Sequence, residues 1–88
     1  MASRLVKVIN RAGLHTRPAA SLVKLAAKFK SEIYLSREGF AINAKSIIGV
    51  MTLAAEQGCL LELKVDGPDE DVAIVELDEL FQNGFGEL

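Results

Sequence analysis

Residues 59–81 read Cys-Leu-Leu-Glu-Leu-Lys-Val-Asp-Gly-Pro-Asp-Glu-Asp-Val-Ala-Ile-Val-Glu-Leu-Asp-Glu-Leu-Phe, and their hydrophobic period changes midway. Leucine and valine alternate with polar residues at first, which predicts a half-buried strand over 59–66 and a turn over 66–68. Beyond the turn, apolar residues recur at three- and four-residue steps, at Ala73, Ile74, Leu77, Leu80 and Phe81. This spacing predicts a helix with Pro68 in its first turn, acidic residues 69–71 at the positive end of its dipole and Gly84 beyond its end.

The preceding residues predict further strands and helices. β-branched residues over 4–10 predict a first strand, which leads into a turn-like loop. Apolar residues with helical spacing predict a helix over 16–29, with Thr16 as a candidate N-cap and Pro18 near its start. Alternation over 31–36, a tight turn at 38–39 and the apolar residues that follow predict a hairpin. Residues 46–53 favour a brief helix over a strand, with Ser46 as its N-cap.

These elements give the order β-α-β-β-α-β-α, which predicts an α+β fold with a four-stranded antiparallel sheet covered on one face by three helices. The chain has 88 residues, of which 50% are hydrophobic and 25% charged, so we expect a single globular domain over 1–88. No apolar run approaches the length that spans a bilayer, and none resembles a secretory segment. We therefore expect a soluble, cytoplasmic protein without membrane insertion.

The charge and the cysteine count limit the function classes. A formal net charge of −2 argues against a nucleic-acid binder, because neutralising phosphates requires a basic surplus. Cys59 is the only cysteine, so an internal disulfide is impossible, and we interpret it as a small buried apolar residue. The sequence has no P-loop, no glycine-rich nucleotide motif and no metal-binding cluster, so we expect no cofactor and no metal.

His15 is the only histidine, and a lone histidine is by default a surface or capping residue. Its neighbours in Gly-Leu-His-Thr-Arg-Pro, residues 13–18, argue for more, because they place the imidazole directly before a helix. The unpaired N–H groups and the positive dipole end of that first turn favour an anion. An unprotonated imidazole nitrogen is also a nucleophile that can carry a phosphoryl group covalently.

Arg17 and Thr16 complete the predicted phosphate site at the helix start. A guanidinium donates two parallel hydrogen bonds to phosphoryl oxygens, which suits Arg17 for assisting transfer from and to His15. The alternative is that His15 is incidental and Arg17 a solvated charge. However, a cation in the first turn opposes the helix dipole, and sequences tend to break local rules at functional sites.

A surface for docking partner proteins is predicted beside this site. The helical period places Arg17, Ser21, Lys24 and Lys28 in one polar and basic stripe, although an ordinary solvated face would look the same. The short helix is too small to bury all of its apolar residues, so some of Ile47, Ile48 and Met51 should face solvent; the alternative is a core-filling helix. Ser46 is both a candidate cap and a candidate switch, since phosphorylation would add negative charge beside this surface.

Two separated segments resemble the HPr family, the histidine-containing phosphocarriers of the bacterial phosphoenolpyruvate:sugar phosphotransferase system. Gly-Leu-His-Thr-Arg-Pro-Ala at 13–19 is similar to the family's active-site motif, and Lys-Ser-Ile-Ile-Gly-Val-Met-Thr-Leu at 45–53 to its regulatory-serine segment. The resemblance implies an open-faced β-sandwich, a monomer, phosphorylation of His15 at Nδ1 by enzyme I and transfer to IIA domains of sugar permeases. It further implies phosphorylation of Ser46 by HPr kinase/phosphorylase, contact with a transcriptional regulator, and docking through Ala20, Lys24, Ile47, Ile48 and Met51.

Alternative functions remain open on the sequence. The chain is either a sugar-branch phosphocarrier, a carrier of the nitrogen-related branch, or a regulatory binding module switched at Ser46. The paralogue Crh lacks the histidine, so His15 excludes it. A hydrolase with His15 as its base is disfavoured, because the motif contains neither a nucleophile nor a carboxylate.

Overall fold

A computed structural model describes residues 1–87 and contains the predicted order of strands and helices. The elements are β1 (Ala2–Lys7), α1 (Thr16–Ala26), β2 (Glu32–Arg37), β3 (Phe40–Asn43), α2 (Ile47–Thr52), β4 (Leu60–Asp66) and α3 (Glu70–Gln82), followed by a 3₁₀ turn over Gly84–Gly86. The prediction of an α+β fold with the order β-α-β-β-α-β-α is therefore confirmed. No helix within residues 1–87 is both long and apolar enough to cross a bilayer.

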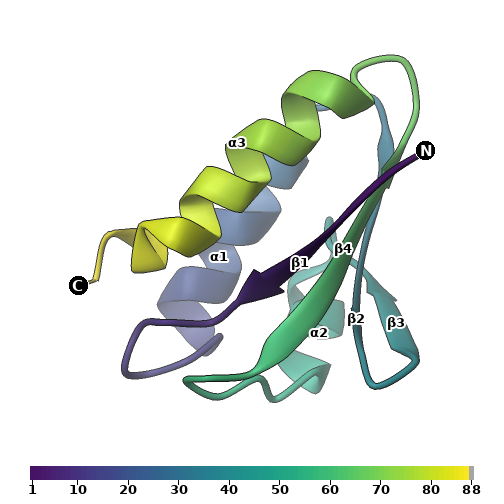
Figure 1. Cartoon of the computed structure of the whole chain (residues 1–88). Coiled ribbons are helices and arrows are strands. Elements are labelled where there is room, and N and C mark those ends of the chain that lie inside the picture. The colour runs from purple at the N-terminus through teal and green to yellow at the C-terminus, as the bar shows by residue number, and fades with distance from the viewer. Residues whose placement is uncertain (88) are drawn as a thin grey trace.

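The four strands form one antiparallel sheet in the order β1-β4-β2-β3. β4 lies between β1 and β2, where Ile33 is opposite Val65 and Leu35 is opposite Leu63. Because side chains alternate along a strand, this register directs all four of these residues to the same face. Figure 1 shows α1 and α3 lying over one face of the sheet and leaving the other open, as an open-faced sandwich requires.

The core lies between the sheet and the three helices. Leu22 of α1, Val50 of α2 and Leu77 of α3 are fully buried and belong to the same apolar cluster as the inward residues of the strands. Cys59 packs against this cluster but is only partly buried, which corrects the prediction of a buried cysteine. The cluster continues into the 3₁₀ turn after α3, where Phe85 packs edge-on against Phe81 with ring centroids 5.0 Å apart.

Several predicted boundaries were wrong. The first strand covers Ala2–Lys7 and not 4–10, because these six residues are the ones that pair with β4. The helix predicted over 16–29 ends at Ala26; the amides of Lys28 and Phe29 make tighter bonds, to the carbonyls of Leu25 and Ala26. These bonds span three residues and not four, so the α-helix ends before the chain enters β2.

The start of α3 also differs from its prediction. Asp69 occupies the N-cap position, so Pro68 precedes the helix and does not lie in its first turn. The Asp69 carboxylate does not cap its own helix; it accepts hydrogen bonds from the amides of Lys30 and Ser31 and from the Ser31 hydroxyl. Asp69 therefore joins the start of α3 to the segment that precedes β2.

Candidate functional site

His15 lies at the N-cap position of α1, with an extended backbone conformation (φ −89°, ψ −162°) and an exposed side chain. Its carbonyl accepts the Ala19 amide at 2.9 Å, which closes the first helical turn. Thr16 is thus the first helical residue, and the prediction that it caps the helix is wrong. The imidazole makes no capping hydrogen bond and is free for chemistry.

The first turn of α1 leaves backbone donors beside His15. Within residues 1–87, the amides of Thr16 and Arg17 have no hydrogen-bond acceptor, and Pro18 has no N–H. First-turn amides and the positive end of the dipole attract anions. Arg17 is exposed and forms no ion pair with the residues described, so its guanidinium is free to reach an anion on the neighbouring imidazole.

The loop before His15 is held by a tight contact with the chain that follows α2. The Leu14 amide donates to the Ala55 carbonyl at 2.9 Å, and the Leu14 side chain is buried. Gly13 adopts φ +72°, and a Cβ atom there would lie 2.5 Å from the Ala55 carbonyl oxygen. Glycine is required at this position, because the left-handed conformation and the close approach both exclude a side chain.

Asn10 supports the same loop from beneath. It is fully buried, and its side-chain amide donates to the Gly13 carbonyl at 2.9 Å and to the Glu87 carboxylate at 3.0 Å. The C-terminal segment, for which the sequence offered no role, thereby reaches the base of the loop that carries His15.

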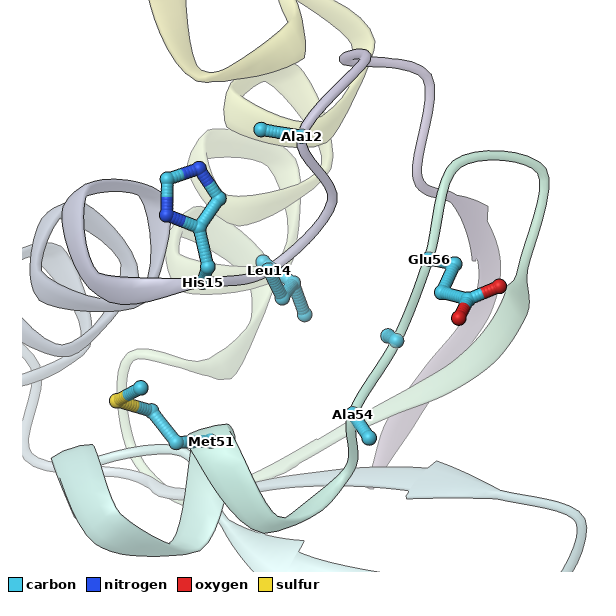
Figure 2. Close-up of a pocket in the computed structure, with 7 residues that line it drawn as sticks. Ala12, Leu14, His15, Met51, Ala54 and Glu56 are labelled. Carbon is cyan, nitrogen blue, oxygen red and sulfur yellow. The ribbon is translucent and has the colours of Figure 1, made fainter.

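A shallow hollow of about 230 Å³ lies next to His15. Its lining combines the His15 loop with α2 and the chain that follows it: Ala12, Leu14, His15, Met51, Ala54, Ala55 and Glu56. Figure 2 shows the imidazole at the start of α1, the Met51 side chain across from it, and the Glu56 carboxylate pointing away from both. The hollow is largely apolar around the imidazole, which suits contact with another protein more than capture of a free anion.

The predicted docking residues lie on two adjacent helices. On α1, Ala20 and Lys24 are exposed. On α2, Ile48 is 75% exposed, Met51 42% and Ile47 38%, while Val50 is buried. The alternative of a core-filling α2 is therefore wrong. Met51 also lines the hollow beside His15, so the apolar surface of α2 adjoins the candidate site.

Ser46 caps α2, as predicted: its hydroxyl accepts the Gly49 amide at 3.1 Å. The residue is exposed at the end of α2 away from Met51. Ser46 and Met51 are five positions apart, which corresponds to about 7.5 Å along the helix axis. A modified Ser46 would thus lie at the edge of the α2 surface.

The sequence did not predict the role of the chain after α2. Residues 54–56 line the hollow and hold the His15 loop, but their sequence of Ala-Ala-Glu has no distinguishing pattern. Gly13 was the available signal, since a glycine before a candidate site often marks a close backbone approach. Over residues 1–87, no group of three histidine, cysteine or acidic residues is arranged to hold a metal ion.

Known proteins are similar to this chain over most of its length. A family model described as "PTS HPr component phosphorylation site" matches residues 2–83. The chain is 52% identical over 87 residues to the phosphocarrier protein HPr of Treponema pallidum, with 99% of each chain covered. It is 50% identical over 80 residues to the HPr of Xylella fastidiosa strain Temecula1, covering 91% of this chain and 90% of that relative. The crystal structure of HPr-C-His from Thermoanaerobacter tengcongensis matches with a TM-score of 0.97 at 41% identity, covering 100% and 99% of the two chains.

Proposed function

The chain belongs to the HPr family of phosphotransferase-system phosphocarriers, and we propose that it carries the phosphoryl group as a covalent adduct on His15. The exposed imidazole next to the free amides of Thr16 and Arg17 is the observation that supports this residue. His15 is the only imidazole in the chain.

The chemistry of the transfer follows from this arrangement. An unprotonated nitrogen of His15 attacks the phosphorus of the donor's phosphoryl group, forming a P–N bond. The bond from phosphorus to the donor breaks, and its electron pair stays with the donor. The Thr16 and Arg17 amides and the Arg17 guanidinium donate to the phosphoryl oxygens and stabilise their charge. Transfer to an acceptor is the same step in reverse.

Enzyme I is the proposed donor and the IIA domains of sugar permeases are the proposed acceptors. Both would dock on the surface formed by Ala20 and Lys24 of α1 and by Ile47, Ile48 and Met51 of α2. Apolar side chains that are exposed next to a reactive group favour a protein partner, because burying them stabilises a complex. We further propose that the protein acts as a monomer in the cytoplasm.

The test is to incubate the purified protein with enzyme I, Mg²⁺ and labelled phosphoenolpyruvate, and then to add a IIA domain. We expect an acid-labile, base-stable label that passes to the IIA domain. His15→Ala should abolish labelling while its far-UV circular dichroism stays unchanged, because the imidazole takes no part in the fold. Labelling of His15→Ala to the level of the parent protein would refute the proposed site.

Regulation at Ser46 is the second proposed function. Its exposed hydroxyl lies at the edge of the apolar α2 surface. A phosphate there would place a hydrated negative charge where a partner packs, which would weaken binding. HPr kinase/phosphorylase is the proposed modifying enzyme, and a transcriptional regulator the proposed reader. Incubation with that kinase and ATP should label the parent protein and leave Ser46→Ala unlabelled.

A further inference from the structure

We infer that Arg37 is a positioning residue for phosphoryl transfer, because it fixes the strained backbone against which the His15 loop is held. This inference rests on the proposed function of His15. Arg37 is the last residue of β2, and its Nη1 donates to the carbonyls of Leu53 and Ala54, each at 2.9 Å. One guanidinium nitrogen thus binds two consecutive carbonyls directly after α2.

Ala54 needs such support because its backbone is left-handed, with φ +50°. This conformation is unfavourable for any residue with a Cβ atom, and such residues keep it only where their surroundings impose it. The end of α2 also concentrates unpaired carbonyls, which attract a cation. Among the residues described, Arg37 supplies the only side-chain donor to these two carbonyls.

The conformation of Ala54 reaches His15 through a short path. The φ and ψ angles of Ala54 set the direction in which the chain continues to Ala55. The Ala55 carbonyl is the acceptor for the Leu14 amide. Gly13 lies directly against the Ala55 carbonyl oxygen, so the position of Gly13 depends on the position of that oxygen. Figure 2 shows the segment that carries Ala54 running beside Leu14, which is the residue directly before His15 in the chain. Loss of Arg37 would therefore release the segment that fixes the loop.

The experiment compares Arg37→Met with Arg4→Met. Methionine keeps an apolar stem for packing and removes the donors. Arg4 is a matched control, because it also joins the sheet to another element, bonding Asp78 of α3 at 2.9 Å, but it lies outside the path to His15. Two quantities are measured for each variant. The first is the hydrogen-exchange rate of the Leu14 amide relative to that of the Ile33 amide. The second is the rate at which the variant accepts the phosphoryl group from enzyme I, at saturating and at limiting concentrations of the variant.

Arg37→Met should raise the relative exchange rate of Leu14 about tenfold, since two hydrogen bonds that oppose local opening are lost. Arg37→Met should also lower the acceptance rate several-fold when the variant is saturating. The variant concentration that gives half of the maximal rate should change less, because the docking surface stays in place. Arg4→Met should leave both quantities within about twofold of the parent protein, since its ion pair is partly exposed and remote. Unchanged Leu14 exchange or unchanged saturated rate in Arg37→Met would overturn the inference.

A second substitution separates strain from simple destabilisation. Ala54→Gly removes the Cβ penalty at φ +50°, so the double variant Arg37→Met/Ala54→Gly should recover much of the lost acceptance rate. A general loss of stability would not be relieved in this way, and failure to recover would count against the inference. If the parent protein takes no phosphoryl group from enzyme I, the proposed function fails, while the Leu14 exchange rates still decide whether Arg37 holds the loop.

Discussion

Gly13→Ala should destabilise the protein more than Gly39→Ala, although both glycines adopt a positive φ. Gly13 has φ +72° and Gly39 has φ +86°, so an alanine meets similar backbone strain at the two positions. They differ in their surroundings. A Cβ atom on Gly13 would lie 2.5 Å from the Ala55 oxygen and 3.1 Å from the Glu56 Cα, whereas nothing lies within 4 Å of a Cβ atom on Gly39.

The magnitudes follow from these contacts. The left-handed conformation costs an alanine about 1 to 2 kcal/mol, which is the whole expected effect at Gly39. At Gly13 the chain must also move away from Ala55, which lengthens the hydrogen bond from the Leu14 amide. Losing the partner of a buried amide costs about 1 to 3 kcal/mol more. The expected total at Gly13 is therefore about 2 to 5 kcal/mol.

Urea unfolding of the two variants measures this difference, with thermal unfolding as a second readout. For a domain of this size, each kcal/mol lowers Tm by about 4 to 8 °C. Gly13→Ala should also slow phosphoryl acceptance, because the loop that carries His15 must shift, whereas Gly39→Ala should not. Equal losses of stability in the two variants would refute the conclusion that the Ala55 contact holds this loop.

Substitutions at three further positions test other parts of the structure. Ser46→Ala removes the acceptor for the Gly49 amide and should lower the free energy of unfolding by about 1 kcal/mol in urea titration, whereas Ser46→Asp should keep the cap yet slow transfer from enzyme I. Ile48→Glu should weaken enzyme I binding in calorimetry and change stability by less than about 0.5 kcal/mol, since this side chain is 75% exposed; unaltered binding would exclude it from the docking surface. The Ser31 hydroxyl and then the Lys30 amide lower the pKa of Asp69 below 3.8, so the unfolded chain binds the proton more readily. The stabilisation from Asp69 is thus present above about pH 4 and is lost as the pH falls through the lowered pKa, and Asp69→Asn should flatten the acid limb of the stability curve.

The secondary structure was predictable because most elements have a local signal. The alternation of β4, the turn at Glu38 and Gly39, and the Ser46 cap each specify their own conformation within a few residues. The errors at β1 and at the start of α3 occurred where a distant partner decides the outcome. Asp69 looked like one of several acidic residues at a helix start, but it binds the segment before β2, which places Pro68 outside the helix.

The candidate site was predictable only in part, for the same reason. The sequence around His15 shows the helix start, the imidazole and the nearby guanidinium, since they are adjacent in the chain. Asn10 supports that loop from three residues before Gly13, but Arg37 and the Ala55 carbonyl act across sequence separations that no local pattern encodes. The placement of Met51 beside His15 likewise required the packing of α1 against α2.

The decisive measurement is the location of the phosphoryl group after reaction with enzyme I and phosphoenolpyruvate. Nuclear magnetic resonance of the ¹⁵N-labelled protein, recorded at neutral pH, detects the coupling between phosphorus and an imidazole nitrogen. We expect a single phosphohistidine, at Nδ1 of His15, and no such signal in a folded His15→Ala variant. A phosphoryl group on a hydroxyl or carboxylate, or none at all with an active enzyme I, would contradict the proposed function.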